Sequence, residues 1–238
     1  NYTISVTDSV ISAADLALAA AKTTGTITIG GTSTISGSYA EVTAITGTTN
    51  GNQNPFSITG IGTAKVNLTD SSNTVAQVKT IIDINNTANG TVTAKITEQD
   101  AQTLLNIPSG PHDLDITVAV TQNQILNNQG VETQALDTKV NATQLDDIDA
   151  LTTKVLKVTS TVLTDTYANA DEIIKVLEAS NSKAQNGTAN TPTISGLESA
   201  NVEFSNTGTI TLDQAQKLTN ANSGTTGLVT ASVASRTI

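Results

Sequence analysis

The sequence contains no Cys, Met or Trp, and aromatic residues make up only 2 % of its 238 positions. The absence of Cys excludes disulfides, thiolate metal sites and a Cys nucleophile. Because rings are so few, the core must be built from Val, Ile, Leu and Ala, and carbohydrate binding by ring stacking has little support. No apolar run approaches the roughly 20 residues that a transmembrane helix requires, so we expect no membrane insertion.

Basic residues are also scarce: 11 Lys and Arg stand against 21 Asp and Glu, which gives a net charge of −10. Phosphate binding needs clustered Lys and Arg, so we expect no nucleic-acid partner. Thr is abundant, with Asn, Ser and Gly behind it, and this bias favours strands and turns. Such a composition is typical of an inert protein outside the cell. The chain begins at Asn1 without a visible signal peptide, so we expect a mature product or a piece of a longer protein.

One short pattern recurs after strand-like runs: Ile or Val, then Ser, Thr or Asn, two further residues, Asp or Gln, and an apolar residue. Its polar pairs are Ser12 and Asp15, Thr97 and Asp100, Thr121 and Gln124, Asn141 and Gln144, and Thr211 and Gln214. Residues of these types three positions apart form the capping box of a helix N-terminus. Ser38 and Glu41 fit the same geometry. Because Gln cannot titrate, the pattern predicts helix starts rather than acid–base catalysis.

Longer segments also resemble one another. Residues 58–70 are similar to residues 194–206, and Ile35–Ala40 is similar to Leu163–Ala168. Internal repetition of this kind sets the architecture of a chain. We therefore predict two diverged halves, residues 1–112 and residues 113–238, with the seam near His112.

The periodicity of apolar residues predicts short strands that alternate with short helices. Ile27 and Ile29 alternate as in a strand, whereas Val75, Val78 and Ile81 have helical spacing. We expect an α/β fold of repeated short strand–helix units with mostly parallel strands. These units are expected to form an elongated, solenoid-like body in which each unit covers its neighbour's apolar face. A compact two-half α/β domain is the alternative.

Two groups of residues could carry chemistry. His112, the single His, has no G-x-S-x-G elbow to serve and is predicted to be a turn residue; one His also excludes a conventional zinc site. Asp146, Asp147 and Asp149 form the densest acidic run and fall on a predicted helix, with Asp146 and Asp149 on one exposed side. We expect a solvated helix face, with a weak calcium site as the alternative, although no calcium-binding loop motif is present. No other cofactor is expected.

Three segments, residues 24–42, 58–70 and 194–202, resemble the Thr/Ala/Asn-rich tandem repeats of giant secreted surface proteins of aquatic bacteria, notably cyanobacteria. Similar repeats also occur in phage virion proteins. The resemblance implies an extracellular structural or adhesive role and supplies no catalytic residues.

We therefore expect an extracellular structural repeat protein, not an enzyme: a subunit or module of a surface layer, a matrix filament or an adhesin. Self-association is expected through the uncovered strands around Thr3–Thr7 and Leu228–Val233. The alternative is a phage fibre or a glycan-binding adhesin module that contacts cell surfaces through the long loops Gly47–Asn54 and Ser180–Thr191. A secreted polysaccharide hydrolase that uses Asp146 and Asp149 is the least favoured reading.

Overall fold

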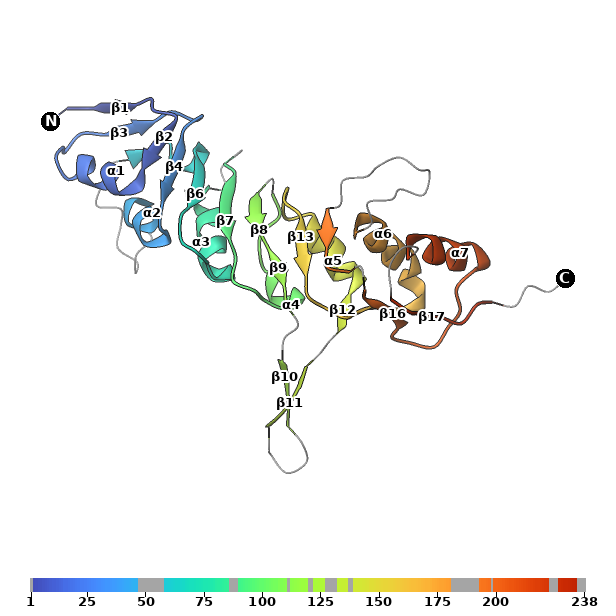
Figure 1. Ribbon diagram of the computed structural model, residues 1–238. Helices are drawn as coiled ribbons and strands as arrows, with labels where there is room; N and C mark the ends of the chain where they lie inside the picture. The colour runs from blue at the N-terminus through green and yellow to red at the C-terminus, as the bar shows by residue number, and fades with distance from the viewer. Residues whose placement is uncertain are drawn as a thin grey trace. The chain divides into compact units, whose positions relative to one another are not determined.

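The computed structural model describes residues 2–46, 58–85, 90–110, 112–119, 122–126, 132–136, 139–180, 193–197, 199–222 and 227–234. The chain forms two compact units. The first unit comprises residues 1–97, 106–115 and 151–153, and the second comprises residues 98–105, 116–150 and 154–238. Each unit is an α/β structure built mostly from parallel strands (Figure 1).

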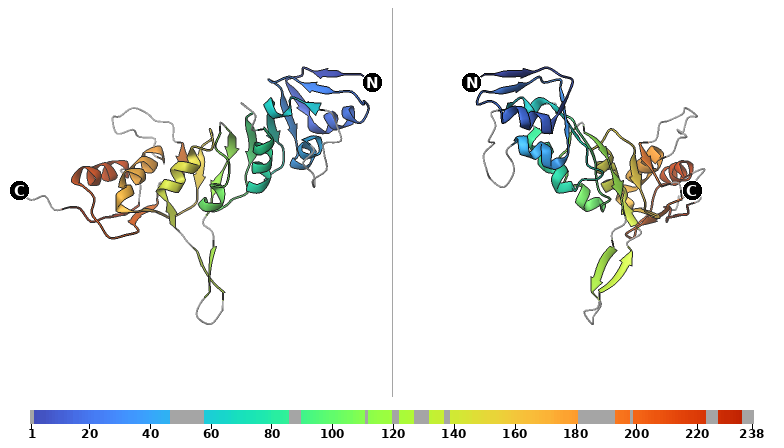
Figure 2. Two further views of the ribbon diagram at one scale, coloured as in Figure 1. Left: turned by 180° about the vertical axis from the view of Figure 1, so that it is seen from behind. Right: turned by 60° about the vertical axis from the view of Figure 1, so that its left-hand side comes forward.

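The described residues of the first unit form two parallel sheets and three α-helices. The smaller sheet, called the β1 sheet, has the order β1 (Ile4–Val6), β3 (Ile27–Ile29), β5 (Ile58–Thr59). The larger sheet, called the β2 sheet, has the order β2 (Val10–Ser12), β4 (Thr34–Gly37), β6 (Lys65–Leu68), β7 (Val92–Lys95), β8 (Asp113–Asp115). The helices are α1 (Ala13–Ala20), α2 (Tyr39–Thr46) and α3 (Val75–Asn85), and α2 packs against both α1 and α3 (Figure 2).

The second unit repeats this plan. Its β9 sheet has the order β9 (Thr117–Val118), β13 (Leu156–Val158), β15 (Ile194–Ser195). Its β12 sheet has the order β12 (Lys139–Asn141), β14 (Val162–Asp165), β16 (Asn201–Phe204), β17 (Val229–Thr230). The helices α4 (Ala101–Leu104), α5 (Ala142–Asp149), α6 (Ala170–Ser180) and α7 (Leu212–Ala221) pack in that order, each against the next. Short 3₁₀ helices span Ile61–Thr63 in the first unit and Tyr167–Asn169 in the second.

The repeating element is a coil of two strands and one helix. Each complete coil runs through one strand of the small sheet, one strand of the large sheet and a helix before the next coil begins, as in β1–β2–α1 and β3–β4–α2. Strands of successive coils pair in parallel. The expected parallel α/β repeat is therefore present, although each complete coil contributes two strands rather than the one that periodicity suggested.

Apolar residues at one register of the β2 sheet form a continuous row inside the first unit. Ile11, Ile35, Val66 and Val92 lie side by side on β2, β4, β6 and β7, and all four are buried. Helix residues at spacings of three and four are buried as predicted, on α3 in this unit and on α5 and α6 in the second unit. Each fully buried Val, Ile or Leu contributes about 1.5–3 kcal/mol, so short strands and short helices are stabilised mainly by packing on their neighbours.

The same coil-to-coil hydrogen bonds occur within both units. The recurring backbone pairs, donor before acceptor and first unit before second, are Lys65 to Ser33 and Asn201 to Thr161, Thr69 to Gly37 and Ser205 to Asp165, Asn73 to Lys95 and Ile210 to Ser232, and Thr97 to Asn73 and Ala234 to Ile210. Matching bonds at matching positions indicate one coil plan used twice.

Two glycines mark the same turn in the two units. Gly60 has φ +89° and Gly196 has φ +96°, a left-handed conformation that residues with a Cβ atom rarely adopt. A Cβ atom at Gly60 would lie 2.3 Å from the carbonyl oxygen of Ile29, and one at Gly196 would clash with that of Val158. Both carbonyls belong to the preceding coil. Glycine therefore allows the backbone to turn closely over its neighbour.

One predicted element is wrong. The pattern at Thr121 and Gln124 predicted a helix start, but Gln124 lies in strand β10 (Gln122–Leu126), and Thr121 lies outside the described residues. Strand β10 pairs antiparallel with β11 (Glu132–Leu136), which also departs from the expected parallel pairing. Strands this close in sequence can pair as a hairpin, whereas parallel pairing requires a longer crossover. The local pattern could not reveal this partner.

Candidate functional site: the contacts between coils and the open strand edges

The capping pattern predicts most helix starts correctly. Ser12 and Asn141 accept hydrogen bonds from the N–H groups three residues later, at the starts of α1 and α5. Thr211 and Gln214 form a complete capping box at α7. The complete boxes elsewhere join Ser38 with Glu41 before α2, as predicted, and Thr74 with Gln77 before α3, which sequence analysis missed. The Thr-x-x-Gln spacing at residues 74–77 would have revealed the latter.

The predicted helix start at Thr97 is wrong by three residues. Asp100 itself is the N-cap of α4, and its carboxylate accepts hydrogen bonds from the N–H and the hydroxyl of Thr103 at 2.9 and 2.6 Å. The Thr97 hydroxyl instead lies 2.6 Å from the hydroxyl of Ser72, in the coil that contains α3. Thr97 therefore joins neighbouring coils, and Asp100 alone caps the helix.

A polar side chain from the next coil caps the backbone of α2 in the first unit and of the Tyr167–Asn169 turn in the second. The carboxylate of Asp70 accepts a hydrogen bond from the N–H of Tyr39 at 2.6 Å. The side-chain oxygen of Asn206 accepts the N–H of Tyr167 at 2.9 Å. These bonds hold each coil to the one that follows it. They give the last residues of the similar segments 58–70 and 194–206 the same structural role.

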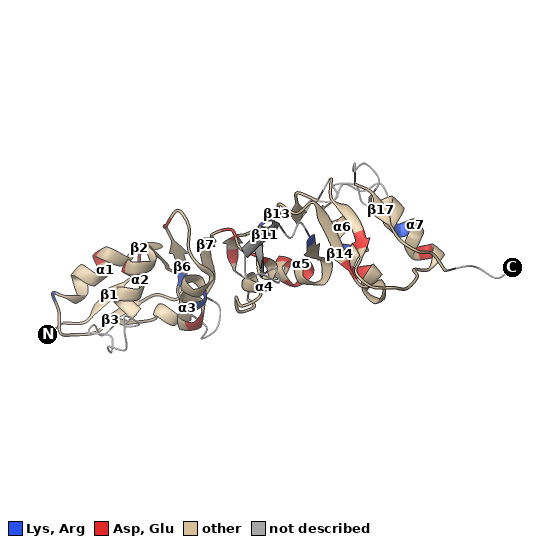
Figure 3. Cartoon of the chain, turned by 90° about the horizontal axis from the view of Figure 1, so that it is seen from below, with Lys and Arg blue, Asp and Glu red and all other residues tan. Residues whose placement is uncertain are grey.

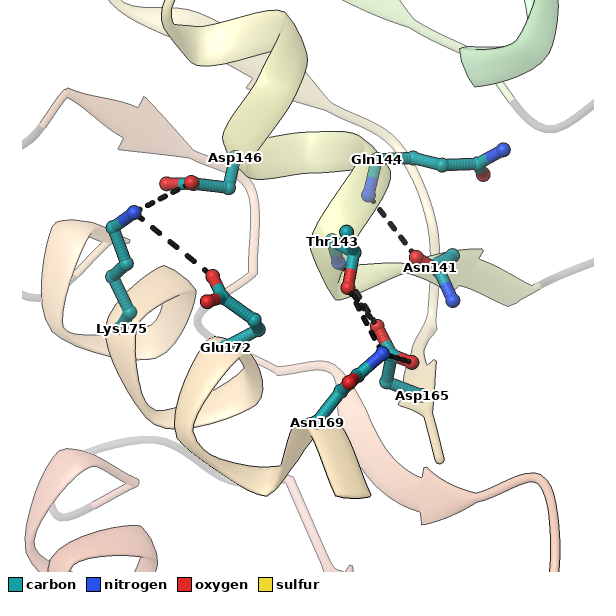
Figure 4. Close-up of polar contacts among 8 residues, drawn as sticks. All are labelled: Asn141, Thr143, Gln144, Asp146, Asp165, Asn169, Glu172 and Lys175. Carbon is teal, nitrogen blue, oxygen red and sulfur yellow. Dashed lines mark hydrogen bonds and ion pairs between the residues drawn. The ribbon is translucent and has the colours of Figure 1, made fainter. Parts of the chain in front are cut away.

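Asp165 joins two coils through its carboxylate, and Figure 4 shows its contacts with Thr143 and Asn169. Its carboxylate accepts bonds from the N–H and hydroxyl of Thr143, the N–H of Thr166 and the amide of Asn169, at 2.7–3.0 Å. Burial opposes ionisation of Asp165, but these four donors outweigh it and lower its pKa. Asp165 is therefore a buried carboxylate with a complete set of partners, and it binds α5 to the coil of α6.

The acidic run on α5 is not the solvated face that was predicted. Asp146 forms an ion pair with Lys175 of α6 at 2.5 Å, shown in Figure 4, and Asp149 is half-buried. Burial raises the pKa of Asp149, partly offset by a hydrogen bond with Thr193. Asp147 remains exposed. Nothing in the described part of the chain brings three or more Asp, Glu, His or Cys side chains together in a metal-binding group.

His112, which was predicted to be a turn residue, is buried. Only 4 % of its surface is exposed, and its Nδ1 accepts a hydrogen bond from the N–H of Val92 at 3.4 Å. Burial lowers the pKa of this imidazole. The ring thus helps to hold β7 within the first unit by accepting the Val92 hydrogen bond. Among the described residues, no hydroxyl or thiol nucleophile is hydrogen-bonded to it.

The strands that were expected to be uncovered do lie at sheet edges. Strands β1 and β2 begin their sheets, and β17 ends its sheet. Large apolar side chains are exposed beside these edges: Val10 on β2, Leu18 on α1, and Leu228 next to β17 are 62 %, 64 % and 67 % exposed. Uncovered strands with exposed apolar neighbours are able to pair with another chain.

The other predicted contact surfaces cannot be placed on the structure. The loop Gly47–Asn54 and residues 181–191 lie outside the described residues.

Lys residues in the described segments are scattered, as Figure 3 shows. Among the described helices, none has both the length and the apolar character needed to cross a membrane.

Comparison with known proteins gives no relative. No protein-family model matches the sequence, and no curated protein or solved structure matches it either.

Proposed function

We propose that the protein is a structural repeat module of an extracellular assembly, such as a surface layer, a matrix filament or an adhesin, and that its coils form a solenoid. The observation that carries this proposal is the recurrence of one set of coil-to-coil hydrogen bonds in both units. A fold whose coils differ little, and each of which binds the next, can be extended without a new kind of contact. Resemblance to repeats of secreted bacterial surface proteins supports the extracellular setting.

The distribution of polar side chains supports a structural role. Asp70, Asn206 and Asp165 each use their oxygens on backbone or hydroxyl donors of an adjacent coil. Asp146 is likewise engaged by Lys175. These four polar side chains are thus occupied in holding coils together. The strand edges at β1 and β17 then supply the means of association between chains.

The decisive experiment is to follow assembly of the purified 238-residue chain. Sedimentation velocity at increasing protein concentration should show species larger than the monomer, and negative-stain electron microscopy should show them as end-to-end chains. Particles that stay monomeric at every concentration, with or without added calcium, would contradict the proposal. Compact closed oligomers without chain growth would contradict it as well, because a repeat module should grow in one direction.

A further inference from the structure

One junction inside the first unit shows how an open edge can be covered. The segment Gly90–Thr97, which contains β7, is paired on its outer side with β8. The partners are Thr93 with Asp113, Ala94 with Leu114, and Lys95 with Asp115. The N–H of Ile96 continues this pairing by donating to the carbonyl of Asp115 at 3.0 Å. Leu114 is completely buried by this contact.

In the part of the second unit that the structure describes, the same segment occurs without its cover. Gly227–Ala234 (GLVTASVA) matches Gly90–Thr97 (GTVTAKIT) in sequence. It also matches in structure, because Val202 donates to Leu228 at 2.8 Å as Val66 donates to Thr91 at 3.0 Å. Among the described residues, β17 pairs with β16 alone.

The outer side of this segment offers two backbone N–H groups. The carbonyl of Ser232 and the N–H of Ala234 both face Ile210, at 2.9 Å each. Because successive residues of a strand alternate in direction, the N–H groups of Ala231 and Val233 face the other way. We call the outer side of residues 230–233 the free edge. Val233 is 45 % exposed there.

The N-terminal residues stand where the covering strand stands, directly before the first strand of a small sheet. Ile4–Val6 and Ile116–Val118 occupy the same place in their units: the carbonyl of Val6 accepts from Gly30 at 3.2 Å, and that of Val118 accepts from Thr159 at 3.1 Å. Two residues before these segments stand Tyr2 and Leu114. Leu114 is buried under the junction, whereas Tyr2 is 56 % exposed.

We propose that the free edge binds the N-terminal segment of a second copy of this chain, with Tyr2 opposite Ala231 and Thr3 opposite Ser232. This register repeats the pairing of Leu114 with Ala94 and of Asp115 with Lys95. Backbone hydrogen bonds to Ala231 and Val233 hold the added strand, and the Tyr2 ring occupies the place that Leu114 takes in the first unit. The inference rests on the proposed function and specifies its contact. Because head and tail are different surfaces, the contact joins copies head to tail rather than as two-fold dimers.

Substitutions on each side of the contact test it. Tyr2→Glu places an unpaired charge in the junction, and Ala231→Pro removes an N–H from the free edge. Each should weaken association by about tenfold or more in sedimentation velocity. Tyr2→Leu, which copies Leu114, should assemble like the unmodified chain. The matched control is Leu18→Glu, which introduces the same charge at a residue of similar exposure outside the junction and should assemble normally.

A mixing experiment separates this contact from any other. Tyr2→Glu keeps a functional free edge, and Ala231→Pro keeps a functional N-terminal segment. An equimolar mixture should therefore form one-to-one dimers that grow no further, although each variant alone is monomeric. Dimer formation also shows that both variants are folded.

The outcomes distinguish this contact from the proposed function. If the unmodified chain assembles and both variants assemble equally well, the chain is still an assembling module but this junction is wrong. If Leu18→Glu alone blocks assembly, the helix side is the contact and the strand register is wrong. If two monomeric variants fail to form a dimer when mixed, the head-to-tail geometry is contradicted. If the unmodified chain never assembles, the proposed function itself fails.

Discussion

At the scale of single residues, Asp165 shows how a buried ionisable side chain of one coil hydrogen-bonds to a neighbouring coil. Asp165 occupies the position that Gly37 has in the first unit, as their shared strand-end hydrogen bonds show. A Cβ atom at Gly37 would come within 2.8 Å of the Ala13 Cβ atom, whereas Asp165 has the donors of Thr143 beside it. The same coil plan thus accepts an apolar contact in one unit and a carboxylate network in the other.

His112 gives a prediction about pH. Burial lowers its pKa in the folded protein, while an unfolded chain has a His pKa of about 6.5. The unfolded state therefore binds the proton more readily, so the contribution of His112 to stability is present above about pH 6.5 and is lost as the pH falls toward its folded pKa. Urea unfolding at pH 8, 6.5 and 5 should show this loss, and His112→Gln should lose less stability over the same range. Identical pH profiles for the two proteins would contradict the prediction.

At the scale of elements, the starts of α1, α5 and α7 could be predicted from sequence because an N-cap and its third following residue lie in one local stretch. The apolar spacing of α3 predicted its buried face for the same reason. The prediction failed at Thr97 and Gln124, whose partners come from elsewhere: Thr97 contacts Ser72, and the strand of Gln124 pairs with β11. Pairing between coils, the burial of His112 and the ion pair of Asp146 are likewise set by distant parts of the chain.

The start of α4 gives a prediction that separates its two polar residues. Asp100→Ala removes the N-cap and should cost about 0.5–2 kcal/mol of unfolding free energy. Thr97→Ala removes only an exposed contact with Ser72 and should cost clearly less. Urea denaturation of both variants beside the unmodified chain measures the difference. Equal losses would mean that Thr97 contributes to the helix start after all.

At the scale of the whole molecule, stability in a stack of coils comes from contacts between neighbours. The complete coils of the first unit are joined in this way through the β1 and β2 sheets and through contacts of α2 with α1 and α3. End coils have one such neighbour instead of two, which is consistent with the exposed Val10 and Leu228 at the edges. Covering an edge by a second chain should therefore stabilise the end coil as well as extend the assembly.

Small-angle X-ray scattering can decide between a solenoid and the compact two-half alternative. A compact domain of 238 residues has a radius of gyration of about 18 Å. A solenoid of the same length should give a clearly larger value, because its coils add along one direction. The Tyr2→Glu variant is the sample of choice, since blocking the proposed junction prevents association from inflating the measurement. A monomer with a radius of gyration near 18 Å would contradict the solenoid, and it would favour a chain whose two units fold back on one another.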